Sequence, residues 1–151
     1  MNLDGLKVLE RIDEVKMMCD RNNPLYEKIS NYSIALYSLG FFDVPDLMEA
    51  DDLDEIEAAD FLKMHFEEVN EFALPSNYTI NESNERYLLV IGDTEFPIHF
   101  AALVDTATKK PFFSKLQFMG SGFDSLEELM NEFQIERKIT MKDIHLFRKI
   151  G

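Results

Sequence analysis

Residues 86–120 read RYLLVIGDTEFPIHFAALVDTATKKPFFSKLQFMG, and this stretch decides the fold. It contains three apolar runs whose side chains alternate with the period of two that is typical of β-strands. The runs are separated by DT at 93–94 and by TATKK at 106–110, which are connections short enough to join antiparallel neighbours. The sequence therefore predicts an antiparallel meander, to which YTI at 78–80 could add a short edge strand.

The alternation also predicts which side chains share a face of this sheet. If the TATKK turn pairs Val104 with Phe112, the apolar side chains of both strands, Phe100 included, fall on one face. A two-residue turn at 93–94 adds Leu89 and Ile91 to the same face. One face of the meander is thus expected to form the main core.

The segments around the meander show the spacing of three and four that is typical of amphipathic helices. Helices are predicted at 6–18, from Pro24 to Gly40, from Asp54 to just before LPSN at 74–77, at 124–133 and at 140–150. The predicted class is α+β: a helical N-terminal half packed on a three- or four-stranded antiparallel meander, with two C-terminal helices. A length of 151 residues suits a single globular domain spanning 1–151.

Charge narrows the classes of partner. The net charge is −14, and residues 1–75 hold 18 acidic and 6 basic residues, against 11 and 9 in residues 76–151. Such a surface repels phosphate backbones and anionic lipids, so neither direct nucleic-acid binding nor membrane binding is expected. The single cysteine, Cys19, and the absence of an apolar signal-like N-terminus or a spanning segment suggest a cytoplasmic protein.

Motifs that would indicate a particular chemistry are absent from the sequence. GSG at 120–122 lacks the further residues of a phosphate-binding loop, and we interpret it as a strand-to-helix turn. One cysteine and three scattered histidines do not form a zinc motif, and no serine lies in a nucleophile elbow. We therefore assign no catalytic residue, no metal ligand and no cofactor, and enzymatic activity stays open.

The most acidic segment is DDLDEIEAADFLKMHFEEVNEF at 51–72. On a helix its apolar positions form one continuous stripe, which predicts the inward-facing residues Leu53, Ile56, Ala59, Leu62, Phe66, Val69 and Ala73. Filling the inward face with carbon leaves the carboxylates outside. A metal site on His65 and Glu68 would need further ligands from a second helix, and no sequence motif supplies them.

The outward carboxylates form the candidate partner-binding site, which comprises Asp51, Asp52, Asp54, Glu57, Asp60, Glu67 and Glu71. An ordinary solvated helix face mixes acids with bases at i, i+4, whereas the segment from Glu49 to Glu71 holds ten acids and one base. This self-repulsion is tolerated when it serves solubility, a cation or a basic partner.

A second candidate site lies on the other predicted face of the meander. His99 alternates out of the core face, and the predicted register places it beside Lys115 and opposite Gln117. Its other neighbours are too apolar to face water, so a helix, a ligand or a partner should cover this face. These three residues are the ligand-pocket candidate.

The sequence thus favours a non-enzymatic, cytoplasmic interaction module whose acidic helical face docks a basic protein surface, as an immunity-like or antitoxin-like inhibitor or an adaptor would. Alternatives are a small-molecule-binding module or minor enzyme built around His99, and a DNA mimic whose carboxylates imitate phosphates. The oligomeric state is open.

Overall fold

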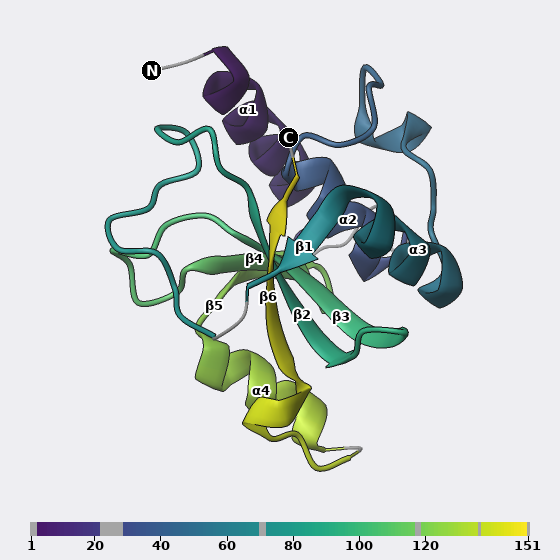
Figure 1. Ribbon diagram of the computed structural model, residues 1–151. Helices are drawn as coiled ribbons and strands as arrows, with labels where there is room; N and C mark the ends of the chain where they lie inside the picture. The colour runs from purple at the N-terminus through teal and green to yellow at the C-terminus, as the bar shows by residue number, and fades with distance from the viewer. Residues whose placement is uncertain (1–2, 22–28, 70–71, 117–118, 136, 151) are drawn as a thin grey trace.

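The computed structural model describes residues 3–21, 29–69, 72–116, 119–135 and 137–150 (Figure 1). The elements in chain order are α1 (Leu3–Met18), α2 (Asn31–Ser38), the 3-10 turn η1 (Leu47–Glu49), α3 (Glu55–His65), β1 (Phe66–Glu68), β2 (Tyr87–Asp93), β3 (Phe96–Leu103), β4 (Phe112–Lys115), β5 (Ser121–Asp124), α4 (Leu126–Gln134), the 3-10 turn η2 (Met141–Asp143) and β6 (Ile144–Lys149).

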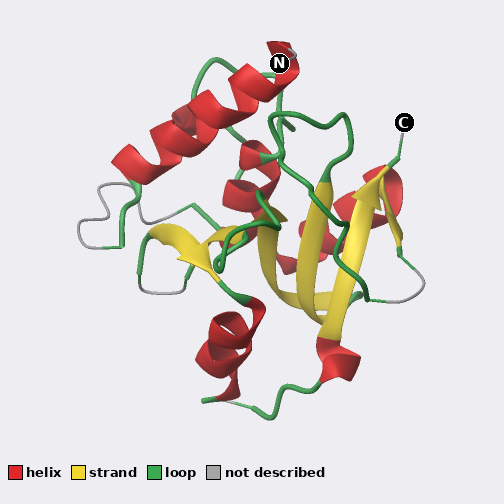
Figure 2. Cartoon of the chain, turned by 90° about the vertical axis from the view of Figure 1, so that its left-hand side faces the viewer, coloured by secondary structure: helices red, strands yellow, loops and turns green. Residues whose placement is uncertain are grey.

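The strands form one antiparallel sheet in the order β1-β6-β2-β3-β4-β5 (Figure 2). The predicted α+β class is confirmed, but the sheet has six strands instead of three or four. The additional strands are β1, β5 and β6, while the predicted edge strand at 78–80 contributes only an isolated bridge between Thr79 and Asp105. Within the described residues, no helix has the length and apolarity to span a membrane.

Three helices differ from their predicted extents. The second, predicted from Pro24, begins at Asn31 with Ser30 as its N-cap, and the described residues 29–30 before it are not helical. The third helix ends at His65, and the chain continues as β1, so the N-terminal half is not wholly helical. The segment 140–150, predicted as a second C-terminal helix, is the turn η2 followed by β6. β6 pairs with β2 on the side away from β3, and this pairing satisfies backbone groups that would otherwise be buried without partners.

A β-bulge at the start of the first hairpin changes the predicted faces. The register shifts between Ile91 and Gly92, which leaves Ile98 without an opposite residue and places Ile91 opposite His99. Gly92 has a φ of 105°, and a Cβ there would lie 2.9 Å from the Ile98 side chain, so glycine permits the bulge. Ile91 therefore shares the face of His99, and the predicted grouping of this strand is wrong.

The second hairpin is offset by one residue from its predicted register. Leu103, not Val104, lies opposite Phe112. The Val104 N–H donates instead to the Pro111 carbonyl at 2.8 Å. Each residue of β3 that pairs with β4 is therefore opposite the residue just before its predicted partner. Because side chains alternate along a strand, this single-residue offset exchanges the faces of β4 relative to β3.

Helices cover both faces of the sheet. Tyr32 of α2 packs edge-on against Phe100 of β3, with ring centroids 4.9 Å apart. The adjacent His99 points to the opposite face, where Phe133 lies 4.8 Å from it, one residue short of the end of α4. α1 and α3 lie on the side of α2, and α4 stands apart from these three helices (Figure 1).

Candidate protein-interaction site

Exposed carboxylates surround the start of α3. They come from η1, from the loop 50–54 and from the first half of α3, and we call them the acidic surface: Glu49, Asp51, Asp52, Asp54, Glu55, Glu57 and Asp60. Five of the seven acids predicted from the sequence belong to it.

Hydrogen bonds hold the loop 50–54 against α2. The buried Ser33 hydroxyl donates to the Asp51 carbonyl at 2.6 Å and accepts from the Leu53 N–H at 2.8 Å. The Asp52 carboxylate accepts from the N–H of Ser30, the N-cap of α2, at 2.8 Å. These bonds present the acidic surface on a defined backbone.

Two of the acids begin α3. Asp54 accepts from the Glu57 N–H at 2.8 Å, and Glu57 accepts from the Asp54 N–H at 3.1 Å, which makes a capping box. Negative charge here also suits the positive end of the helix dipole. Local helix stability therefore explains Asp54 and Glu57 without any partner.

The other acids take no part in the capping box, although Glu55 also lies in the first turn of α3. Within the described residues, no hydrogen bond or ion pair involves the side chains of Glu49, Asp51, Glu55 or Asp60. Lys63, a basic residue of α3, binds Glu95 of the β2–β3 turn at 2.7 Å, and this hydrogen bond raises the pKa of Lys63. The ion pair of Lys63 is therefore made with the turn and not with the acidic surface. The repulsion among these carboxylates is not relieved by pairing.

Glu67, another predicted partner-binding residue, does not belong to the acidic surface. Glu67 lies on β1 and pairs with Arg148 of β6, because the helix on which the prediction depended has already ended. Glu71 lies outside the described residues. The candidate site is consequently shorter than the sequence suggests.

The inward side of α3 also differs from the prediction. Ala58, Ala59 and Leu62 are buried, whereas Ile56, predicted to be buried, is 63% exposed. Ala58 and Ala59 allow α3 to pack closely on the sheet, since the side chains at a contact set the separation of the elements. The larger Ile56 is thereby turned toward solvent.

His65 belongs to an aromatic cluster. Its ring lies 4.3 Å from that of Phe61 and 5.7 Å from that of Phe41. Among the residues that the structure describes, no group of three or more His, Cys, Asp or Glu side chains is arranged to hold a metal ion.

The second candidate, His99, is enclosed. It is 1% exposed, and its Nε2 has no hydrogen-bond partner among the described residues. Burial, followed by the positive charges of Arg21 and Lys115, lowers the pKa of His99 to about 3. The ring is therefore neutral at pH 7. Of the helix, ligand or partner that the sequence suggested as a cover for this face, the structure shows a helix.

The group predicted around His99 does not assemble. Lys115 lies on the opposite face of the sheet, because the one-residue offset of the second hairpin reverses β4. Gln117 lies outside the described residues. The sequence missed Arg21, which approaches from the end of α1 and acts electrostatically on His99.

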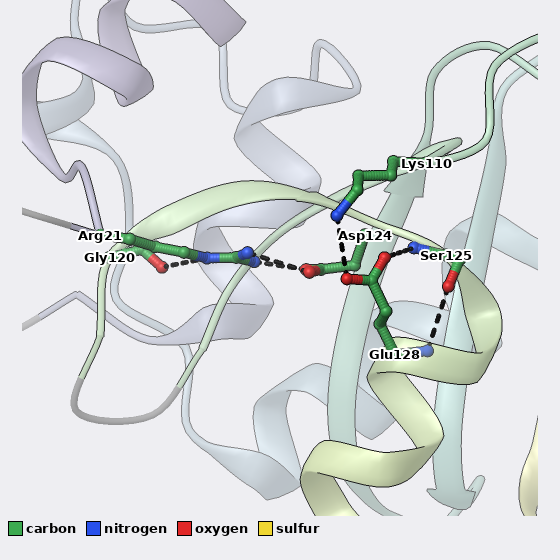
Figure 3. A network of polar contacts seen from close by, with 6 residues as sticks. All are labelled: Arg21, Lys110, Gly120, Asp124, Ser125 and Glu128. Carbon is green, nitrogen blue, oxygen red and sulfur yellow. Dashed lines mark hydrogen bonds and ion pairs between the residues drawn. The ribbon is translucent and has the colours of Figure 1, made fainter.

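Arg21 belongs to a polar network at the edge strand β5 (Figure 3). It makes a bidentate ion pair with the buried Asp124 and donates to the Gly120 carbonyl at 3.4 Å. A Cβ on Gly120 would lie 2.1 Å from the backbone of Asp20, and one on Gly122 would lie 2.9 Å from the Arg21 guanidinium. The GSG motif thus permits the chain at 19–21 to lie against the start of β5, where Asp20 forms a parallel bridge with Ser121. The predicted strand-to-helix turn is wrong, because residues 121–122 belong to β5.

A surface pocket of about 400 Å³ opens between this network and α4. Arg21 and Asp124 in its lining pair with each other. Glu128, also in the lining, accepts from the Ser125 N–H and from Lys110, and these bonds lower its pKa. Arg21 and Asp124 thus form an ion pair at the edge strand β5, and Glu128 caps α4. His99 does not line the pocket.

Comparisons with protein-family models, with curated proteins and with solved structures give no match.

Proposed function

We propose that this protein is a non-enzymatic, cytoplasmic interaction module whose acidic surface docks a basic protein. The proposal rests on one observation: the side chains of Glu49, Asp51, Glu55 and Asp60 gather around the start of α3 without hydrogen bonds or ion pairs to the described residues. Neither helix capping nor pairing accounts for them. An inhibitor of the immunity or antitoxin kind, or an adaptor, would use such a surface to attract its partner.

Electrostatic complementarity explains how the surface would work. Clustered charges of one sign accelerate the encounter with a basic protein and disfavour acidic ones. Because the charges are exposed, salt screens them over a distance of about 8 Å at physiological ionic strength. Association should therefore weaken as salt is added.

The test compares two charge-matched variants. The surface variant replaces Glu49, Asp51, Glu55 and Asp60 by Gln or Asn. The control variant neutralises four other exposed acids, Glu10, Asp13, Glu82 and Glu132. Both change the net charge equally, and neither removes a hydrogen bond in the described structure, so both should fold.

Each protein is immobilised and used to capture partners from a native lysate at low and high salt. We expect the wild type and the control variant to retain a basic protein that high salt releases, and the surface variant to lose it. Equal retention by both variants would contradict the proposal. A DNA mimic would instead require that the captured protein bind duplex DNA and that the duplex compete for it.

A further inference from the structure

The outer face of α3 is apolar as well as acidic. Ile56 is 63% exposed and Met64 is 71% exposed. At about 100° per residue, Ile56, Asp60 and Met64 follow one another at intervals of about 40° around the helix, opposite its buried side. Two large apolar side chains thus flank an unpaired carboxylate.

The β2–β3 turn is tied to this helix, because Lys63 of α3 binds Glu95 of the turn at 2.7 Å. The outer face of α3 therefore carries Ile56 and Met64 without a lysine or arginine of the helix free to pair with Asp60. We call Ile56 and Met64 the apolar anchors.

We infer that the apolar anchors and the acidic surface together bind a basic amphipathic segment of a partner protein, such as a helix with lysines and arginines beside an apolar stripe. This inference rests on the proposed function and specifies the chemistry of its partner. The partner's bases would face the carboxylates, while its apolar side chains would cover Ile56 and Met64. Amphipathic helices are commonly recognised through such spaced apolar contacts.

Charge complementarity selects this occupant over a second copy of the chain. Self-association through this face would bring two acidic surfaces together in a protein of net charge −14. A basic segment relieves the same repulsion. The exposed methionine also suits a surface that adapts to its partner, because its side chain is flexible and polarizable.

Two synthetic peptides of about 18 residues test the inference, a length of five helical turns. Both contain the same lysines and leucines, but only the first places leucines at the i, i+3, i+4 and i+7 positions. We expect the first peptide to bind the wild type about tenfold or more tightly than the scrambled peptide, as measured by fluorescence anisotropy, because its leucines bury the anchors.

A variant with Ile56→Ser and Met64→Ser should bind both peptides with the weaker affinity of the scrambled one. The matched control, Met17→Ser with Ile135→Ser, removes exposed apolar side chains elsewhere and should keep the preference. All these positions are exposed, so thermal midpoints should stay within about 2 °C of the wild type.

The outcomes separate this inference from the proposed function. Equal, salt-sensitive binding of both peptides would overturn the apolar part and leave an electrostatic docking surface. Failure of both peptides to bind would overturn the inference, while the lysate capture would still decide the proposed function. A wild-type dimer in sedimentation that the Ile56 and Met64 variant loses would show that a second copy occupies the face, which would also overturn the inference.

Discussion

Acidification should destabilise this protein through His99. The neutral ring is buried, and its pKa is lowered to about 3, against about 6.5 in an unfolded chain. The unfolded state therefore binds the proton more readily than the folded state does. The stabilising effect of a neutral His99 is complete above pH 6.5 and is lost progressively as the pH falls toward 3.

The magnitude follows from these two pKa values. At pH 5 the unfolded chain has protonated this histidine almost fully, while the folded protein has not, and the difference is about 2 kcal/mol in the free energy of unfolding. Partial relaxation of α4 would reduce this value.

The test is urea denaturation at pH 7 and at pH 5, followed by circular dichroism. His99→Leu keeps an apolar side chain of similar size under Phe133, so its stability at pH 7 should lie within about 1.5 kcal/mol of the wild type. Between pH 7 and pH 5 it should lose about 2 kcal/mol less than the wild type, because the carboxylates titrate in both proteins.

His65→Gln retains His99 and should keep the wild-type sensitivity. The reasoning fails if the wild type and His99→Leu change equally between the two pH values, since His99 would then titrate alike in the folded and unfolded states.

Four further predictions concern substitutions at buried positions, and urea denaturation monitored by circular dichroism checks each of them. Arg11→Met should cost about 3 kcal/mol, because the buried guanidinium donates to three backbone carbonyls that would lose their donor; wild-type stability would contradict this. Gly120→Ala should cost more than about 2 kcal/mol through its clash with the Asp20 backbone, and an unchanged urea midpoint would show that the two segments are not in contact. Ser114→Ala should be neutral or stabilising, because the buried hydroxyl has no partner among the described residues; a loss above about 1 kcal/mol would reveal one. Phe66→Ala should cost about 3–5 kcal/mol, as truncation of a buried aromatic does, and a small loss would place Phe66 outside the core.

The candidate site could be predicted where it depends on local sequence. Asp51, Asp52 and Asp54 are exposed as expected, since charged residues in a short loop have no apolar surface to cover. Glu67 was wrongly included because the apolar spacing continues past His65, although the backbone there has already turned into β1. A periodic pattern does not reveal where pairing with a distant strand interrupts a helix.

The anchors and the network around Arg21 could not be predicted from spacing. Ile56 fits the inward stripe of an isolated helix, and only packing of Ala58 and Ala59 against the rest of the protein turns it outward. Arg21 and Asp124 are 103 positions apart, and nothing local relates them.

By itself, the sequence determined the α+β class, the central meander, the first helix, the second helix from Asn31 onward, α4 and the acidic character of residues 51–60, because composition and periodicity are local properties of a chain. The tertiary structure alone decided the bulge at Gly92, the register of β4, the strand β6 and the orientation of α3. Each of these features depends on which backbone groups and which surfaces are buried when segments distant in the sequence pack together. A one-residue shift in strand register moves every side chain of a strand to the other face of the sheet.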